Sequence, residues 1–196
     1  TIWTGEGMPK KSFEWQKYSL FMIPHNYWHQ FSNMQGDKPV RLLHYNYLPV
    51  TLSGIKDVNF LFNNPYQVPD FIGNQEKDFY SEAKTVMQPH CNVRGKRSIW
   101  YGNFFPDMRA FDKLDVNANR GGGGSTVFIH FQDSEMTCHM SVFDARSYKK
   151  AHRHGPGRVI VIPVGDGYTI LWEEGKDKSI VPWHEASVLV PPNKWF

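Results

Sequence analysis

Cysteine is scarce in this chain of 196 residues, which has only Cys91 and Cys138. They lie far apart and form no CxxC pair, so the sequence argues against a disulfide scaffold or a cysteine zinc site. We expect two buried, reduced thiols. Long apolar runs are also missing, because runs such as Val159–Ile162 are far shorter than the roughly 20 residues of a membrane-spanning helix.

An excess of charge of one sign is missing as well. The 22 Lys and Arg against 19 Asp and Glu give a net charge of +3, and the basic residues are scattered. That field is too weak to predict a nucleic acid or a membrane as a partner. The chain opens at Thr1 without a basic-then-apolar leader, so we expect a cytoplasmic protein. Apolar residues are plentiful, at 40% hydrophobic and 15% aromatic, which suffices for a packed core.

An internal repeat organises the chain. Residues 1–28 lie without gaps on residues 169–196, at a constant offset of 168. The identical pairs are Thr1/Thr169, Ile2/Ile170, Glu6/Glu174, Gly7/Gly175, Lys10/Lys178, Trp15/Trp183, Ser19/Ser187 and Pro24/Pro192. This register indicates a duplicated structural unit. The alternative is two similar hairpins that arose by chance.

The coarse pattern predicts an all-β protein, because β-branched and apolar stretches bounded by turn residues recur along the chain. Their spacing suits a sandwich or a barrel. We expect short helices within 54–71 and 75–87, and a boundary near residue 120. Residues 117–125 resemble a glycine-serine linker, and the alternative is a natural loop before the strand at Thr126. The expected strands are 18–23, 40–47, 126–131, 137–143, 158–164, 168–172 and 187–190.

Histidines carry any chemistry that the sequence offers. Among nine, the pair His152 and His154 stands out. In a strand, residues two apart project from the same face, so these imidazoles would lie close enough to share a metal ion. The alternative is an exposed basic loop. His130 and His139 alternate with apolar residues, and we expect core or lining roles for them.

Around these histidines the chain resembles the cupin superfamily. Its first motif, G(x)5HxH(x)3-4E(x)6G, matches at His152, His154 and Gly165 when Arg158 takes the Glu position, while Arg146 takes the opening Gly position. Its second motif, G(x)5PxGxxHxxxN, matches in spacing at Pro24, His29 and Asn33, with Asn26 in place of Gly.

The order of the motifs is reversed, as in a piece from the middle of a two-domain bicupin. The resemblance therefore implies jelly-roll β-barrel halves joined by a short helical connecting region. Residues 1–53 would be the C-terminal half of the first cupin domain, 54–119 the connector, and 120–196 the N-terminal part of the second domain.

The resemblance also implies a metal-dependent enzyme that acts on a small carboxylate or enol-type substrate, as a dioxygenase or a decarboxylase. His152 and His154 would be metal ligands, with His29 as the equivalent ligand of the other domain. Arg158 would hold an anionic substrate group. The expected metal is Fe(II), then Mn(II), Zn or Ni.

Loss of the motif's Glu leaves open a metal-free, non-catalytic cupin that binds a small ligand or serves assembly. Because the two halves are repeats, a composite site that joins His29 to His152 and His154 is also open. As partners we expect a small molecule, and either a second copy of the chain or the missing parts of the same protein.

Overall fold

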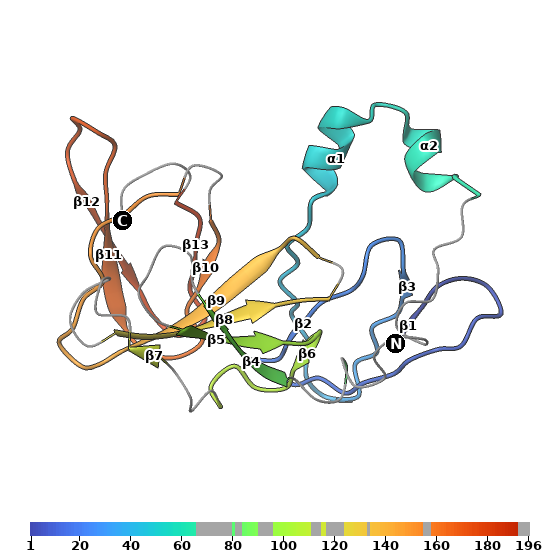
Figure 1. Ribbon diagram of the computed structural model, residues 1–196, viewed down its shortest axis with the longest axis horizontal. Helices are drawn as coiled ribbons and strands as arrows, with labels where there is room; N and C mark the ends of the chain where they lie inside the picture. Colours follow the sequence, from blue (N-terminus) through green and yellow to red (C-terminus); the bar gives the residue numbers. More distant parts are fainter. Residues whose placement is uncertain are drawn as a thin grey trace. The chain divides into compact units, whose positions relative to one another are not determined.

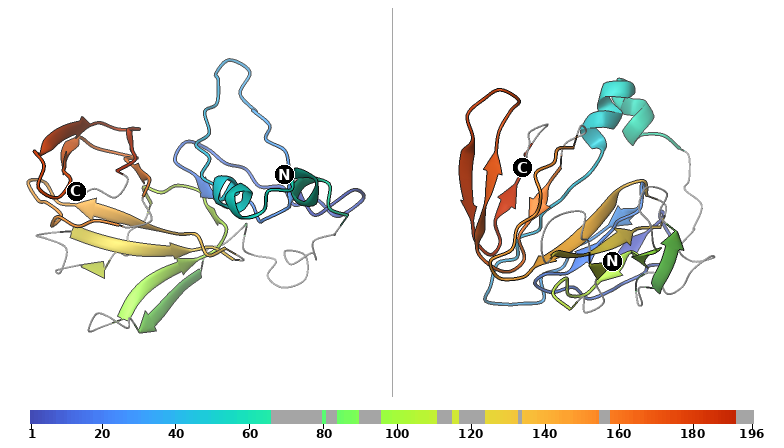
Figure 2. Two further views of the ribbon diagram at one scale, coloured as in Figure 1. Left: turned by 90° about the horizontal axis from the view of Figure 1, so that it is seen from above. Right: turned by 60° about the vertical axis from the view of Figure 1, so that its left-hand side comes forward.

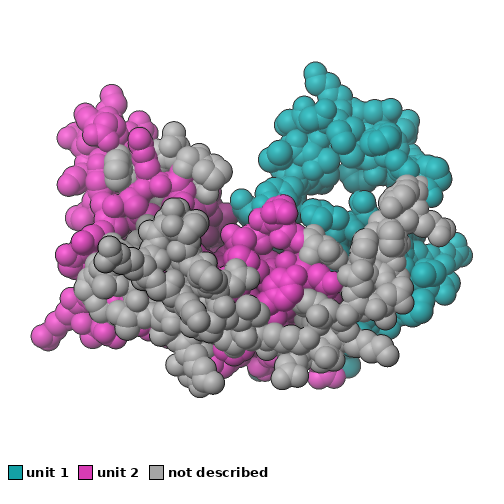
Figure 3. All heavy atoms as spheres, viewed as in Figure 1, with its two compact units in different colours: residues 1–13, 23–77 teal, residues 14–22, 78–196 magenta. Residues whose placement is uncertain are grey.

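A computed structural model of the protein describes residues 1–65, 80, 84–89, 96–110, 115–116, 124–132, 134–154 and 158–191. The chain divides into two compact units, coloured separately in Figure 3. Unit 1 comprises residues 1–13 and 23–77, and unit 2 comprises residues 14–22 and 78–196. Each unit is described by itself.

Unit 1 contains little regular structure in its described part. Strands β1 (Ile2–Trp3) and β3 (Trp28–His29) pair antiparallel, and two short helices follow, α1 (Leu48–Gly54) and α2 (Val58–Phe62), as Figure 1 shows. The Asp57 side chain caps α2 by accepting bonds from two backbone N–H groups of its first turn. Neither helix buries any of its own residues.

The largest sheet lies in unit 2 and has the order β4-β5-β8-β7, with β9 also paired to β8. Only the β5–β8 pair is parallel among these pairings. Figure 1 shows β8 and β9 as its long central hairpin. The strands are β4 (Lys84–Pro89), β5 (Lys96–Tyr101), β7 (Asp115–Val116), β8 (Gly124–His130) and β9 (Thr137–Phe143).

One face of β8 forms the core of unit 2. Val127 and Ile129 alternate along the strand and are fully buried, as period-two alternation requires for one face of a sheet. Ile129 packs with Phe105 and Phe131, and these two rings meet edge to face at 6.2 Å. The opposite face of β8 is therefore the one available to a site.

Three two-stranded sheets complete the strands described in unit 2. The pair β11–β12 forms the long hairpin seen in both views of Figure 2. Gly167 opens β11 because any side chain there would collide with the Trp183 ring across the pair. The pairs are β2 (Leu20–Phe21) with β6 (Phe104–Phe105), β10 (Ile160–Val161) with β13 (Val188–Leu189), and β11 (Gly167–Leu171) with β12 (Ser179–Trp183).

The repeat seen in the sequence recurs in the backbone. Strands β2 and β13 occupy equivalent positions at the offset of 168. Gly7 and Gly175, which are also equivalent, have φ angles of 73° and 71°. Tyr18 and Ala186 are equivalent too, with φ angles of 70° and 66°, although neither is glycine. Matching left-handed residues at matching places support a real duplication over chance.

Side-chain hydrogen bonds repeat at the same offset. Ser19 Oγ accepts from the backbone N–H of Gln16 at 2.9 Å, and Ser187 Oγ accepts from that of His184 at 2.9 Å. These two turns belong to unit 2, where Lys17 donates to Glu185 at 3.0 Å. Lys17 and Glu185 are equivalent positions of the repeat. Contact between equivalent residues is what a two-fold arrangement of the two turns would produce.

The all-β class is confirmed, but several element predictions are wrong in detail. Residues 40–47 form no strand: Val40, Leu43 and Tyr45 are exposed and have no partner strand to complete a ladder. The helix expected over 75–87 is contradicted at 84–87, where β4 pairs with β5. The rest of that range lies outside the described residues, apart from Tyr80, which forms a turn.

Other strand predictions differ less from the observed strands. Strand 137–143 is confirmed at both ends, and 126–131 lies within one residue of β8 at its end. Strand 158–164 shrinks to β10, because only two of its residues pair with β13. Gly124 and Ser125 of the linker-like run start β8 instead, pairing with β9. None of the helices in the described ranges is long and apolar enough to cross a bilayer.

Candidate functional site

The outer face of the β8–β9 hairpin carries polar side chains opposite the core. His139 faces Phe128 across the pair, with ring centroids 5.7 Å apart. Thr126 and Ser141 are the next pair on this face, and their hydroxyl oxygens lie 3.3 Å apart. Because the hairpin is fixed by core packing on its other face, these groups project from a rigid support.

Arg158, which lies just before β10, reaches this face. Its Nη1 lies 3.1 Å from both ring nitrogens of His139. Its Nη2 donates to Nδ1 of His154 at 3.3 Å. A guanidinium is always protonated and only donates, so each neutral imidazole can accept from it through one ring nitrogen only, the one that carries no proton. Arg158 therefore joins two histidines that come from different segments of unit 2.

Lys149 adds a second basic side chain. Its Nζ lies 3.5 Å from Nε2 of His139 and 3.4 Å from Oγ of Ser141. Arg158 and Lys149 thus converge on the same imidazole. Two positive side chains beside one imidazole would both attract an anion bound there. The arrangement is therefore electrostatically suited to an anion.

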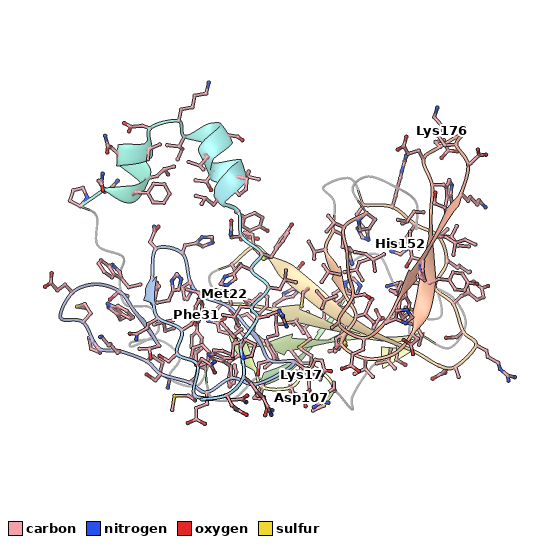
Figure 4. The ribbon with its side chains drawn as sticks, turned by 180° about the vertical axis from the view of Figure 1, so that it is seen from behind. Lys17, Met22, Phe31, Asp107, His152 and Lys176 are labelled. Carbon is pink, nitrogen blue, oxygen red and sulfur yellow. The ribbon has the colours of Figure 1, made fainter. Side chains whose placement is uncertain are left out.

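His152 lies beside His154, with ring centroids 5.1 Å apart and planes at 80°. Nδ1 of His152 lies 2.9 Å from the backbone oxygen of Lys150. Because a backbone oxygen only accepts, Nδ1 of His152 donates in this contact. Residues 151–154 are not a strand, so the two rings are adjacent for a reason other than the predicted alternation. Figure 4 labels His152.

These residues do not complete a metal site. Within the described part of the chain, no group of three His, Cys, Asp or Glu side chains is placed to hold a metal ion. His152 and His154 supply two ring donors, fewer than the three protein ligands usual for an open catalytic centre. Nδ1 of His154 already accepts from Arg158.

His29 lies in unit 1, on β3, whereas His152 and His154 lie in unit 2. Its Nδ1 lies 3.3 Å from the backbone oxygen of Tyr27. Its ring lies 5.3 Å from that of Phe31, labelled in Figure 4, and Phe31 in turn contacts His44. The structure thus describes His29 in an exposed aromatic cluster of its own unit.

From the sequence, His139 was expected only in a core or lining role, and Lys149 was not placed in the site. The signal for His139 was present, because Thr137, His139 and Ser141 alternate with Cys138 and Met140, which separates a polar face from a core face. Lys149 had no comparable signal, since it precedes the histidines in a segment without regular structure.

Cys138 has the surroundings of a structural cysteine, not of a reactive thiol. It is a free cysteine that packs against the core residues Phe105, Ile129 and Phe131. Burial raises the pKa of its thiol to about 12, and the positive charge of Arg158 offsets this only in part. The thiol is therefore protonated and unreactive near neutral pH. Cys91 lies outside the described residues.

Cys138 should react with Ellman's reagent at pH 8 only after unfolding. The variant Cys91→Ser isolates this thiol, and native and denatured samples are compared.

The raised pKa of Cys138 also makes stability depend on pH. The unfolded thiol, with a pKa near 9, loses its proton at a lower pH than the folded one. The free energy of unfolding should accordingly fall between pH 9 and 12 by more in Cys91→Ser than in Cys91→Ser/Cys138→Ala. Rapid native labelling at pH 8 would contradict the expected burial.

Comparison with known proteins identified no relative of this chain. No family model matches the chain, and neither a curated protein nor a solved structure matches it. Evidence for function therefore comes from the arrangement of Arg158, Lys149 and the histidines around them.

Proposed function

We propose that unit 2 is a cupin-like domain that binds a small carboxylate without requiring a metal ion. The observation that carries this proposal is the guanidinium of Arg158, held between His139 and His154. Arg158 presents a planar set of N–H donors that matches the two oxygens of a carboxylate. Lys149 and the neighbouring imidazoles supply further nitrogen groups around that anion.

The electrostatics favour an anion over a neutral ligand. Arg158 and Lys149 both approach His139, so both would attract a carboxylate bound beside that imidazole. Removing one charged donor typically costs about 1.5–3 kcal/mol, which corresponds to roughly a 10- to 100-fold loss of affinity.

Backbone conformation supports the cupin part of the proposal. The two motifs have Gly at positions that fall here on Tyr18, Asn26, Arg146 and Gly165. All four have positive φ angles, of 70°, 61°, 64° and 101°. Positive φ is the reason a family retains glycine at a position. The chain thus has the backbone that the motifs require, even where it lacks their glycines.

The duplication supports a bicupin in particular. Ala186 stands at the position equivalent to Tyr18 and shares its left-handed backbone. Strands β2 and β13 follow these two residues at the same distance. The same turn and strand are therefore built twice, which is the expected result of two related domains in one chain.

Calorimetric titration with oxalate and with succinate tests the proposal. We expect wild-type protein to bind at least one of them, and Arg158→Met to weaken that binding by roughly 10- to 100-fold. Lys149→Met should weaken it as well. The matched controls are Arg153→Met and Lys150→Met, which remove the same charges from exposed neighbours.

If the variants and their controls lose the same affinity, the loss comes from the change in overall charge, and the site is rejected. Binding that survives Arg158→Met unchanged would reject it too. Far-UV circular dichroism and a thermal melt of each variant establish that the fold is retained. Neutral acetamide serves as the ligand control, because it has the shape of a carboxylate without its charge.

A metal-dependent bicupin enzyme is the second candidate, favoured by the 5.1 Å separation of the His152 and His154 rings. A bound Fe(II), Mn(II), Zn or Ni would supply Lewis acidity for oxidative cleavage or decarboxylation of a carboxylate or enol substrate. Metal analysis of purified protein beside a His152→Ala/His154→Ala variant decides it. Near-stoichiometric metal that disappears in the variant supports the enzyme; folded, metal-free wild type opposes it.

A further inference from the structure

Arg158 occupies the position where the first cupin motif has its Glu. We infer that this guanidinium takes the place of a divalent metal ion, so that a covalently attached cation organises the histidines of unit 2. The inference rests on the proposed anion site, and it adds the reason why that site selects anions. One residue, Arg158, would set the ligand class.

The contacts of Arg158 are to the atoms that a metal would need. A metal binds the lone pair of a neutral imidazole nitrogen. In this structure Nδ1 of His154 accepts from Nη2 of Arg158 at 3.3 Å, and the ring nitrogens of His139 lie 3.1 Å from Nη1. The same lone pair cannot serve a guanidinium N–H and a metal together. Arg158 and a metal at these nitrogens would therefore exclude each other.

The charge of Arg158 also disfavours a metal ion at these nitrogens. A guanidinium keeps its positive charge at every pH relevant to a protein, so a divalent ion nearby would always meet repulsion. Lys149 also approaches His139 and adds to that repulsion. A Glu at position 158 would reverse the sign, attract a cation and offer a carboxylate oxygen as a ligand.

Titration with Zn²⁺ tests the inference. We expect Arg158→Glu to bind about one Zn²⁺ with an affinity roughly 100-fold above that of wild type, a range in which neighbouring groups change metal affinity. Adding His154→Ala to Arg158→Glu should remove the gain. The control is Arg153→Glu, which makes the same charge change at an exposed position beside both histidines and should leave affinity near that of wild type.

Arg158→Gln keeps the result decisive if Arg158→Glu misfolds. It removes the charge and retains an amide of similar reach, so we expect roughly a 10-fold gain in Zn²⁺ affinity. The inference is overturned if wild type binds Zn²⁺ stoichiometrically through His154, or if Arg158→Glu and Arg153→Glu gain equally. Oxalate binding is measured separately in wild type, so failure of the anion site and failure of this inference give different results.

Discussion

Replacing Ile129 with Ala should lower the free energy of unfolding by about 2–5 kcal/mol, the range for large-to-small changes in a close-packed core. Ile129 is completely buried and packs with Phe105 and Phe131. Leu20 and Trp100, which are partly buried, pack against the same cluster. Because this cluster joins β8 to β2, β5 and β6, the cavity left by the substitution cannot close by moving one side chain.

Denaturation with guanidinium chloride, followed by tryptophan fluorescence, measures the effect. The matched control is Ile180→Ala on β12, where the side chain is 67% exposed and the expected change is within about 0.5 kcal/mol. The two variants delete the same atoms and differ in burial. Comparable losses would show that Ile129 is not the centre of the core of unit 2.

Sequence pattern predicted the fold class because strand alternation is a local property. The run 137–143 separates His139 and Ser141 from Cys138 and Met140, and that separation is what the sheet uses. The pattern at 40–47 looked similar and formed no strand. A strand needs a partner as well as alternation, and the partner is set by the rest of the chain.

The candidate site was predicted in part. The pair His152 and His154 was found from its spacing, and the two rings do lie together. Arg158 was predicted to hold an anion, and its contacts to His139 and His154 are compatible with that role. His139 joins the same cluster although it lies 10 residues before Lys149 and 19 residues before Arg158 along the chain. Contacts of that kind depend on how the segment after β9 folds back, which no local pattern encodes.

The glycine positions show a different limit of sequence reading. Arg146 and Asn26 stand where the cupin motifs have Gly, and from the sequence alone these were departures that weakened the resemblance. Their φ angles of 64° and 61° are positive, so both residues have the left-handed backbone that glycine adopts most readily. Residues other than glycine can adopt this conformation at a cost of roughly 1–2 kcal/mol, so identity and geometry can separate.

Replacing Asn103 with Ala should be the second large effect, at about 2–4 kcal/mol, because it leaves a buried donor without its acceptor and also opens a cavity. Asn103 is 1% exposed, and its Oδ1 accepts from the backbone N–H of Gln132 at 2.8 Å. Its backbone oxygen accepts from Met22, labelled in Figure 4, at 2.8 Å. This residue therefore connects the segment after β8 to the ends of β2 and β6.

Asn33→Ala is the matched control for Asn103→Ala. Oδ1 of Asn33 also accepts from a backbone N–H, that of Gln35 at 3.0 Å, and its Nδ2 donates to the backbone oxygen of Lys38 at 2.8 Å, but both bonds are exposed. Water can replace the lost acceptor there, so we expect a change of only about 0.5 kcal/mol. The two substitutions break the same kind of hydrogen bond in different surroundings, and chemical denaturation compares them directly. If both cost the same, burial does not determine the contribution of Asn103, and its side-chain bond is not what fixes the end of β8.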